Sequence, residues 1–216
     1  MILYEDRDII VCEKTAGIPV QTAKIGTPDM VSILKNYRKE NEQIQGEPYL
    51  GLVHRLDQPV EGLIVFAKHK QAAAELSKQQ MKKCYQALVQ GILIEEDGHL
   101  IDYLLKDGKT NTSKIVKEGT KGAKRAELYY RVSARSEEAT LLEIRLITGR
   151  HHQIRVQLAG MGFPLFGERK YNQAEITKQI SELALCASRL SFLHPKTRQE
   201  MLFEIEPKGA IFRQFL

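Results

Sequence analysis

Hydrophobic and polar residues alternate along several stretches of this chain, and the alternation predicts a sheet-rich fold. A period of two is the pattern of a half-buried β-strand, because successive side chains point to opposite faces. In the clearest case, Leu142, Ile144 and Leu146 alternate with Glu143 and Arg145. The predicted strands are Ile9–Glu13, Leu63–Ala67, Tyr85–Val89, Leu128–Val132, Leu141–Ile147 and Met201–Ile205.

Apolar spacings of three and four residues predict three helices, at Val31–Glu40, Gln71–Lys83 and His151–Ala159. Many strands with few intervening helices favour an α+β domain built on a largely antiparallel sheet. The chain has no Pro/Ser-rich linker, low-complexity tract or internal repeat. We therefore expect a single domain over residues 1–216.

One short polar segment stands between apolar runs in GLVHRLDQPVEGLIVFAKH, residues 51–69. It carries Asp57 next to Arg55, just before a strand-like run that begins at Leu63. Polar loops at the mouth of a buried sheet are where such folds tend to keep their chemistry. The alternative is an ordinary Arg-Asp pair on the surface.

A second polar segment, LITGRHHQIRVQLAG, covers residues 146–160. On the predicted helix, His151 and Arg155 are i,i+4 neighbours, and His152 and Arg155 are i,i+3 neighbours. This spacing predicts a basic cluster near the start of the helix, where free backbone N–H groups also attract anions. The alternative is a basic helix face in solvent.

The two segments together resemble the signatures of the RluA-type family of RNA pseudouridine synthases. The first signature corresponds to His54-Arg55-Leu56-Asp57, and the second to the run from Thr148 to Arg155 followed by Gly162 and Pro164. A third match is KKCYQALVQG, residues 82–91, and the two ends of the chain are similar to the family as well. The chain departs from the family pattern at Thr15, Val60, Glu61, Gln157, Glu168 and Cys186.

The resemblance implies a pseudouridine synthase fold, with a mixed sheet, flanking helices and loops, and a central catalytic cleft. It implies that Asp57 is the catalytic carboxylate, either as a nucleophile at C1′ or as a base, that Arg155 is its ion-pair partner, and that Tyr85 lies against the target base. Arg55 is a candidate to fill the gap left by the extruded uridine. The other substrate-binding candidates are His54, Arg150 and His152, although the two histidines suit loop bracing better than chemistry. The reaction needs no redox step, no external group donor and no metal, so we expect no cofactor.

The chain is basic, with 32 Lys+Arg against 27 Asp+Glu, a net charge of +5 and a pI near 9.0. Seven of the basic residues lie between Lys106 and Arg125, in a window with three glycines that reads as a mobile basic hairpin or loop. A solvated lysine-rich face is the alternative. Beside a flipped-base site we favour phosphate contacts to RNA, from Lys121, Lys124 and Arg125.

Several classes of protein are excluded by what the sequence lacks. It shows no signal peptide and no apolar run of the length of a membrane span, and its three cysteines are scattered. We expect a cytoplasmic monomer without a metal site, acting on ribosomal or transfer RNA. Because the likeness begins at Ile2, we expect no extra N-terminal RNA-binding module.

Two other functions remain open from the sequence. A catalytically silent RNA-binding relative is suggested by Val60 and Glu61, where the family has Thr-Ser. A hydrolase acting on another glycosidic bond would need a second, proton-donating carboxylate, and only Glu61 is near Asp57 in sequence.

Overall fold

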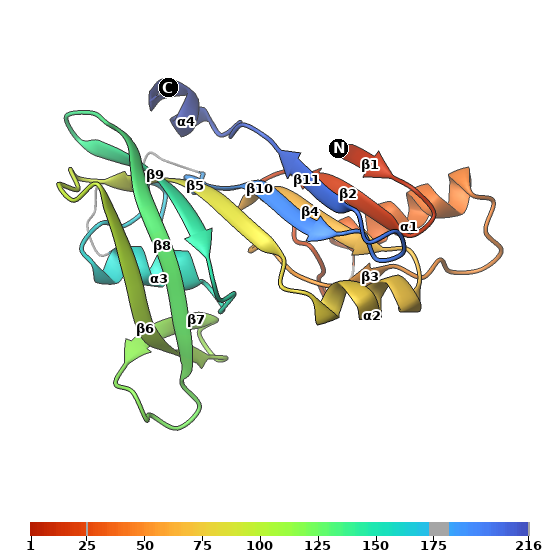
Figure 1. Cartoon of the computed structure of the whole chain (residues 1–216), viewed down its shortest axis with the longest axis horizontal. Helices are drawn as coiled ribbons and strands as arrows, with labels where there is room; N and C mark the ends of the chain where they lie inside the picture. The colour runs from red at the N-terminus through yellow and green to blue at the C-terminus, as the bar shows by residue number, and fades with distance from the viewer. Residues whose placement is uncertain (25, 173–181, 216) are drawn as a thin grey trace. The chain divides into compact units, whose positions relative to one another are not determined.

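The computed structural model describes residues 1–24, 26–172 and 182–215, which form two compact units (Figure 1). Unit 1 comprises Met1–Lys82 and Ala187–Glu206, and unit 2 comprises Lys83–Cys186 and Pro207–Leu216. The single domain expected over residues 1–216, and the central cleft expected in it, stay predictions.

Unit 1 contains a sheet with two helices, α1 (Met30–Asn41) and α2 (Lys70–Lys78). Its main strands follow the order β1 (Ile2–Glu5), β2 (Ile9–Lys14), β4 (Glu61–Ala67) and β10 (Leu185–Leu193), the last of which begins in unit 2. Two short strands extend this sheet: β3 (Gly51–Leu52) pairs with β4, and β11 (Glu200–Glu204) pairs with β10. The β1–β2, β2–β4, β3–β4 and β10–β11 pairings are antiparallel.

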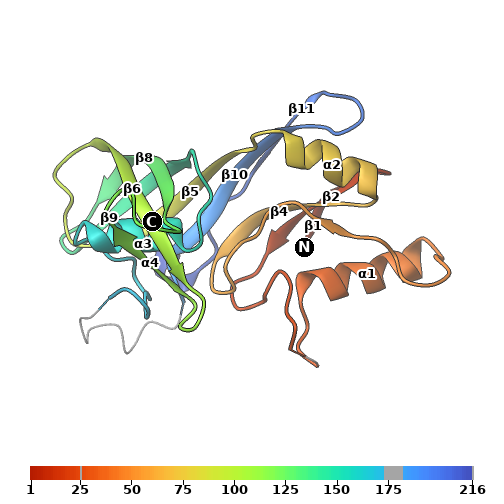
Figure 2. The same cartoon turned by 90° about the horizontal axis from the view of Figure 1, so that it is seen from below.

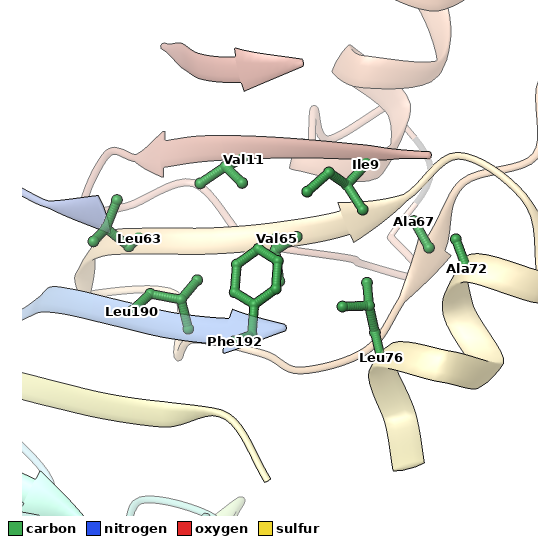
Figure 3. Close-up of a cluster of buried hydrophobic side chains, with 9 residues drawn as sticks. All are labelled: Ile9, Val11, Leu63, Val65, Ala67, Ala72, Leu76, Leu190 and Phe192. Atoms are coloured by element: carbon green, nitrogen blue, oxygen red, sulfur yellow. The ribbon is translucent and has the colours of Figure 1, made fainter. Parts of the chain in front are cut away.

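The core of unit 1 lies between one face of this sheet and α2 (Figure 3). Ala72 and Leu76 of α2 pack against side chains from three neighbouring strands, which are Ile9 and Val11 of β2, Leu63, Val65 and Ala67 of β4, and Leu190 and Phe192 of β10. Every residue of β2 and β4 is buried, which explains why these strands have apolar runs rather than strict alternation. The Asp57 loop leads directly into β4 and is therefore attached to a fully buried strand.

Unit 2 contains a longer antiparallel sheet with α3 (Gln153–Gly160) and α4 (Ala210–Phe215). Its strands follow the order β5 (Lys82–Gln90), β9 (Ala139–Leu146), β8 (Lys124–Arg135), β6 (Asp97–Asp107) and β7 (Thr112–Val116). Helix α3 contacts β6 and β7 (Figure 2). The basic window between residues 106 and 125 contains the β6–β7 turn and the loop into β8, so the hairpin is confirmed, whereas its mobility stays a prediction.

The predicted α+β class with a largely antiparallel sheet is confirmed, but two helix boundaries were wrong. The helix predicted at Gln71–Lys83 ends at Lys78, because Gln79 has extended backbone angles and Lys82 already begins β5. The helix predicted at His151–Ala159 begins only at Gln153, because His152 is in the left-handed conformation with φ 53°. The predicted i,i+4 pair of His151 and Arg155 on one helix face is therefore wrong.

A Gly62→Ala substitution is expected to destabilise the protein strongly. Gly62 opens β4 with φ 129°, and an added Cβ would lie 2.5 Å from the backbone nitrogen of Ala187. Backbone strain and a clash with backbone atoms each cost about 1–3 kcal/mol. We expect urea denaturation to show a decrease of about 2–5 kcal/mol in the free energy of unfolding.

Gly17→Ala is the matched control for Gly62→Ala. Gly17 also has a positive φ, 88°, but an added Cβ there would meet no atom within 4 Å. It therefore reports the cost of the backbone angle alone. Equal decreases in the free energy of unfolding of the two variants would show that the close approach of Gly62 to Ala187 does not contribute to the loss of stability.

Candidate functional site

Asp57 lies half-buried in unit 1 at the first position of a tight turn. The backbone N–H of Val60 donates to the carbonyl of Asp57 at 3.0 Å, which closes the turn. Leu56 and Val60, on either side of it, are 7 % and 2 % exposed and so anchor the turn in the core. The backbone at Asp57 is thus held in place by its neighbours, while the residue remains partly accessible to solvent.

Lys14, at the end of β2, lies beneath this turn and ties it to the preceding loop. Its ammonium donates to the carbonyl oxygens of Thr15, Ile18 and Gln58 at 3.0, 2.7 and 2.9 Å. The side chain is fully buried, and burial lowers the pKa of Lys14 from 10.5 to about 8, although the negative charges of Asp57 and Glu61 act in the opposite direction. Gln58 makes two further bonds to Gly17, through its carbonyl and its side-chain amide.

The other candidates from the first segment have different surroundings. His54 accepts a hydrogen bond through Nε2 from the backbone N–H of Val65 at 3.2 Å, so it braces the loop against β4. Arg55 is exposed, which suits a side chain that would enter RNA. Glu61 is only 9 % exposed, and its negative charge acts on the buried Lys14 ammonium.

Arg155 lies in unit 2, buried on α3, and its described partner is Glu168. The guanidinium Nε and Nη2 bind the two carboxylate oxygens of Glu168 at 2.7 and 2.8 Å, with both side chains at most 5 % exposed. The alternative of a basic helix face in solvent is therefore wrong for Arg155. Its expected pairing with Asp57 stays a prediction.

Tyr85 lies on β5 in unit 2 and is 6 % exposed. It pairs with Ile144 of β9, and Lys83 points to the same face of β5 because the two are two residues apart. Burial lowers the pKa of Lys83. A buried phenol and a desolvated ammonium on one strand face are uncommon in an apolar core.

The basic candidates are exposed around the start of β8. Lys121, Lys124, Arg125 and Arg150 are all exposed, and the Arg150 Nε donates to the Arg125 carbonyl at 2.8 Å. The Arg125 side chain pairs with Glu127. Arg125 and Arg150 thus lie together although 25 residues separate them.

His152 is buried and bonded within the protein. It is 7 % exposed, and its Nδ1 lies 2.6 Å from the Tyr171 hydroxyl. Burial, followed by the positive charges of Arg155, His151 and Lys170, lowers the pKa of His152 to about 3, so the ring is neutral near pH 7. This environment fits the bracing role expected from the sequence.

The structure also assigns importance to residues that the sequence analysis passed over. Lys14 had a signal, since it is a lysine inside an otherwise buried strand. Glu168 was noted only as a departure from the family pattern, with no partner expected for it, and Tyr171 had no signal. Their partners Arg155 and His152 are 13 and 19 positions away in the sequence.

One group of side chains among the described residues has metal-ligand chemistry: Asp6, Asp8 and His194, whose ligand atoms all lie within 4.8 Å of one another. These groups already have partners. Asp6 accepts from the backbone N–H groups of Asp8 and Ile9 and from His194 Nε2, at 2.8–2.9 Å. The group therefore fastens the β1–β2 turn to the β10–β11 hairpin. Among residues 1–24, 26–172 and 182–215, no helix is long and apolar enough to cross a membrane.

Comparison with protein families gives a match over most of the chain. The family model described as RNA pseudouridylate synthase matches residues 8–160. That range contains Asp57, Tyr85 and Arg155, and it spans the whole of the Asp57 turn in unit 1 and of α3 in unit 2.

Curated relatives and solved structures agree with this match. An uncharacterized RNA pseudouridine synthase of Bacillus subtilis is 35 % identical over 94 % of this chain and 67 % of its own length. The ribosomal large subunit pseudouridine synthase C of Buchnera aphidicola is 31 % identical over the whole chain and 69 % of its own length. The ribosomal large subunit pseudouridine synthase D of Nitrosomonas europaea is 34 % identical over 94 % of the chain and 60 % of its own. The fold is similar to that of human RNA Pseudouridylate Synthase Domain Containing 4, with a TM-score of 0.78 and 24 % identity over 96 % of this chain and 88 % of that one.

Proposed function

Because the chain belongs to the RluA-type family of RNA pseudouridine synthases, we propose that Asp57 is the carboxylate with which it isomerises uridine. The enzyme is an isomerase, since uridine and pseudouridine have the same atoms. The C1′–N1 glycosidic bond breaks, the base turns and a C5–C1′ bond forms, after which the hydrogen at C5 leaves as a proton and N1 takes up a proton. One carboxylate suffices, as a nucleophile at C1′ or as a base that removes the 2′ hydrogen.

The observation that carries this proposal is how the Asp57 turn is held. Its flanking residues Leu56 and Val60 are buried, and the Lys14 ammonium binds the Gln58 carbonyl directly after it. Catalytic groups act efficiently when they are positioned in advance by rigid surroundings. An ordinary surface Arg-Asp pair would need no such support.

The roles of the other site residues are part of the same proposal. Arg155 pairs with the catalytic carboxylate and Tyr85 contacts the target base, as the family motifs imply. Arg55 is exposed and takes the place of the extruded uridine in the RNA stack, since its planar group can stack and donate hydrogen bonds at once. His54 and His152 support these groups through their own bonds to Val65 and Tyr171.

We propose that the substrate is ribosomal RNA, and that the enzyme works on it in the cytoplasm as a monomer. Relatives covering nearly all of this chain carry the name ribosomal large subunit pseudouridine synthase. Mapping pseudouridines in RNA from a strain without the gene, against its parent, tests the substrate. Loss of a ribosomal pseudouridine that returns with the wild-type gene, but not with Asp57→Asn, is expected. Loss confined to transfer RNA would overturn the choice of substrate.

Neutralising Lys121, Lys124 and Arg125 to glutamine or alanine together is expected to weaken RNA binding and reduce its salt dependence. All three are exposed, and Arg125 contacts Arg150. Removing one phosphate contact reduces the steepness of log K against log salt by about 0.7–0.9. Binding titrations at several salt concentrations measure this. Neutralising exposed Lys24, Lys70 and Lys78 of unit 1 is the matched control. An unchanged slope in the unit 2 variant would mean that these residues only face solvent.

A further inference from the structure

Arg155 is held on one edge by a buried carboxylate. Its Nε and Nη2 donate hydrogen bonds to the two carboxylate oxygens of Glu168, which is fully buried. Glu168 is itself fixed, because the backbone N–H of Lys170 donates to its Oε1 at 2.7 Å. A bidentate pair of this kind fixes the plane of the guanidinium as well as its position. The Nη1 side therefore faces away from Glu168.

The same guanidinium also lies over the aromatic ring of Tyr171. The Arg155 Cζ lies 5.5 Å from the centre of the Tyr171 ring, within cation–π distance. The ring also packs against a small apolar cluster, formed by Leu104 of β6, Ala126 of β8 and Val156 of α3. Glu168, Tyr171 and His152 thus surround Arg155, and we refer to these three residues as the Arg155 clamp.

The hydroxyl of Tyr171 connects the clamp to the β6–β7 hairpin. It accepts a hydrogen bond from the backbone N–H of Ser113 on β7 at 2.9 Å, and it lies 2.6 Å from His152 Nδ1. Because the His152 ring is neutral near pH 7, its Nδ1 can accept a hydrogen bond from the Tyr171 hydroxyl. The oxygen of the same hydroxyl accepts the hydrogen bond from the Ser113 N–H. One hydroxyl therefore joins a strand of the hairpin to the residue before α3.

Further contacts fasten the hairpin to the same place. Ser113 Oγ lies 2.9 Å from His151 Nδ1, and the Lys170 ammonium donates to the carbonyl of Asn111 in the hairpin turn at 2.7 Å. Ile115 lies so close to Gly160 of α3 that a Cβ there would meet its Cδ1 at 2.5 Å. Lys106 of β6, Lys109 of the turn and Lys114 of β7 are exposed.

We propose that Tyr171 is a positioning residue that couples the β6–β7 hairpin to Arg155, so that RNA held by the hairpin sets the orientation of the catalytic arginine. The inference rests on the proposed function, in which Arg155 serves the catalytic carboxylate and the hairpin meets phosphates. A hydrogen bond joins Ser113 of the hairpin to Tyr171, and the ring of Tyr171 contacts the Arg155 guanidinium. The buried ion pair with Glu168 holds the other edge of that guanidinium.

The test is a double-mutant cycle on kcat measured with saturating RNA. Tyr171→Phe keeps the ring against Arg155 and removes the hydroxyl. The hairpin variant replaces Lys106, Lys109 and Lys114 with glutamine. We expect each to lower kcat, Tyr171→Phe by up to about 100-fold because small misplacements of a catalytic group cost that much. The combination should be no slower than Tyr171→Phe alone, because the hairpin no longer communicates with the arginine.

A matched control keeps the result specific to the clamp. Tyr37→Phe in unit 1 also removes one partnered hydroxyl, which donates to Glu5 at 2.8 Å, and it should leave kcat unchanged. Thermal melting of every variant shows whether a fall in kcat reflects loss of fold. If Tyr171→Phe melts early, the cycle is run at a lower temperature at which every variant stays folded.

Two results would overturn the coupling while leaving the enzyme's function intact. One is a wild-type kcat in Tyr171→Phe. The other is a double variant whose fold-decrease in kcat is the product of the two single decreases, since independent effects multiply. A wild-type protein that forms no pseudouridine in any RNA would instead contradict the proposed function itself.

Discussion

An Asp57→Asn enzyme is expected to fold and bind RNA as the wild type does and to form no pseudouridine. Asparagine has the shape of aspartate, and the turn is held by Leu56, Val60 and the Lys14–Gln58 bond rather than by the carboxylate. An amide can act neither as a nucleophile at C1′ nor as a base. We expect the rate to fall by at least about 10²–10⁴-fold, the usual contribution of one positioned acid-base group.

Three measurements check this expectation together: thermal melting, equilibrium RNA binding, and chromatography of the nucleosides after digestion of the RNA. Asp97→Asn, an exposed carboxylate on β6, is the matched control and should turn over at the wild-type rate. A variant that melts early would show that Asp57 has a structural role. Pseudouridine formed at near the wild-type rate would show that another group does the chemistry.

A Lys14→Met substitution is expected to lower both stability and activity. It keeps most of the buried side-chain volume and removes the ammonium that donates to the carbonyls of Thr15, Ile18 and Gln58. Among the residues that the structure describes, only the Gln58 carbonyl of these three has a second donor, the Gly17 N–H. Each buried polar group left unpaired costs about 1–3 kcal/mol. We expect a decrease of at least about 2 kcal/mol in the free energy of unfolding, measured by urea denaturation. Because Gln58 follows Asp57, kcat should fall even at temperatures where the variant stays folded.

The pH dependence of this effect has a defined sign. The pKa of Lys14 is about 8 in the folded protein and 10.5 in the unfolded chain, so the unfolded chain binds more protons between these values. The contribution of Lys14 to the free energy of unfolding therefore rises with pH across that window. The difference in stability between wild type and Lys14→Met should grow from about pH 8 to about pH 10.5, the window between the two pKa values.

Exposed Lys24→Met is the control for both measurements, since it removes a lysine that is not buried. It should match the wild type in stability, in kcat and in the pH profile. A Lys14→Met variant as stable and active as Lys24→Met would show that the three carbonyl contacts do not support the turn. A stability difference that narrows above about pH 8 would contradict the lowered pKa.

The sequence predicted several strands whose burial is simple, but it missed β10, which is almost continuously buried, as well as strands with mixed exposure. Residues 63–67 and 85–89 were identified because their apolar character is continuous or alternates cleanly. Strands β6 and β7 carry charged and polar residues on exposed positions, which masked their period of two. The start of α3 was misplaced because His152 adopts a left-handed conformation, which no periodicity records.

The site was predictable as far as its residues lie close together in sequence. The run from His54 to Asp57 could be recognised as a motif, and so could the run from Thr148 to Arg155. The support around these runs joins distant segments, such as Lys14 with Gln58 and Tyr171 with Ser113. Those contacts depend on tertiary packing, and a single sequence carries no pattern for them.

Release of tritium from RNA that contains 5-tritiated uridine tests the central claim most directly, because the new C5–C1′ bond can form only when the hydrogen at C5 leaves. Wild-type protein should release tritium into water in proportion to the pseudouridine formed, and Asp57→Asn should release none above background. Tritium release that survives in Asp57→Asn, or free uracil appearing in place of tritium with the wild type, would contradict the account.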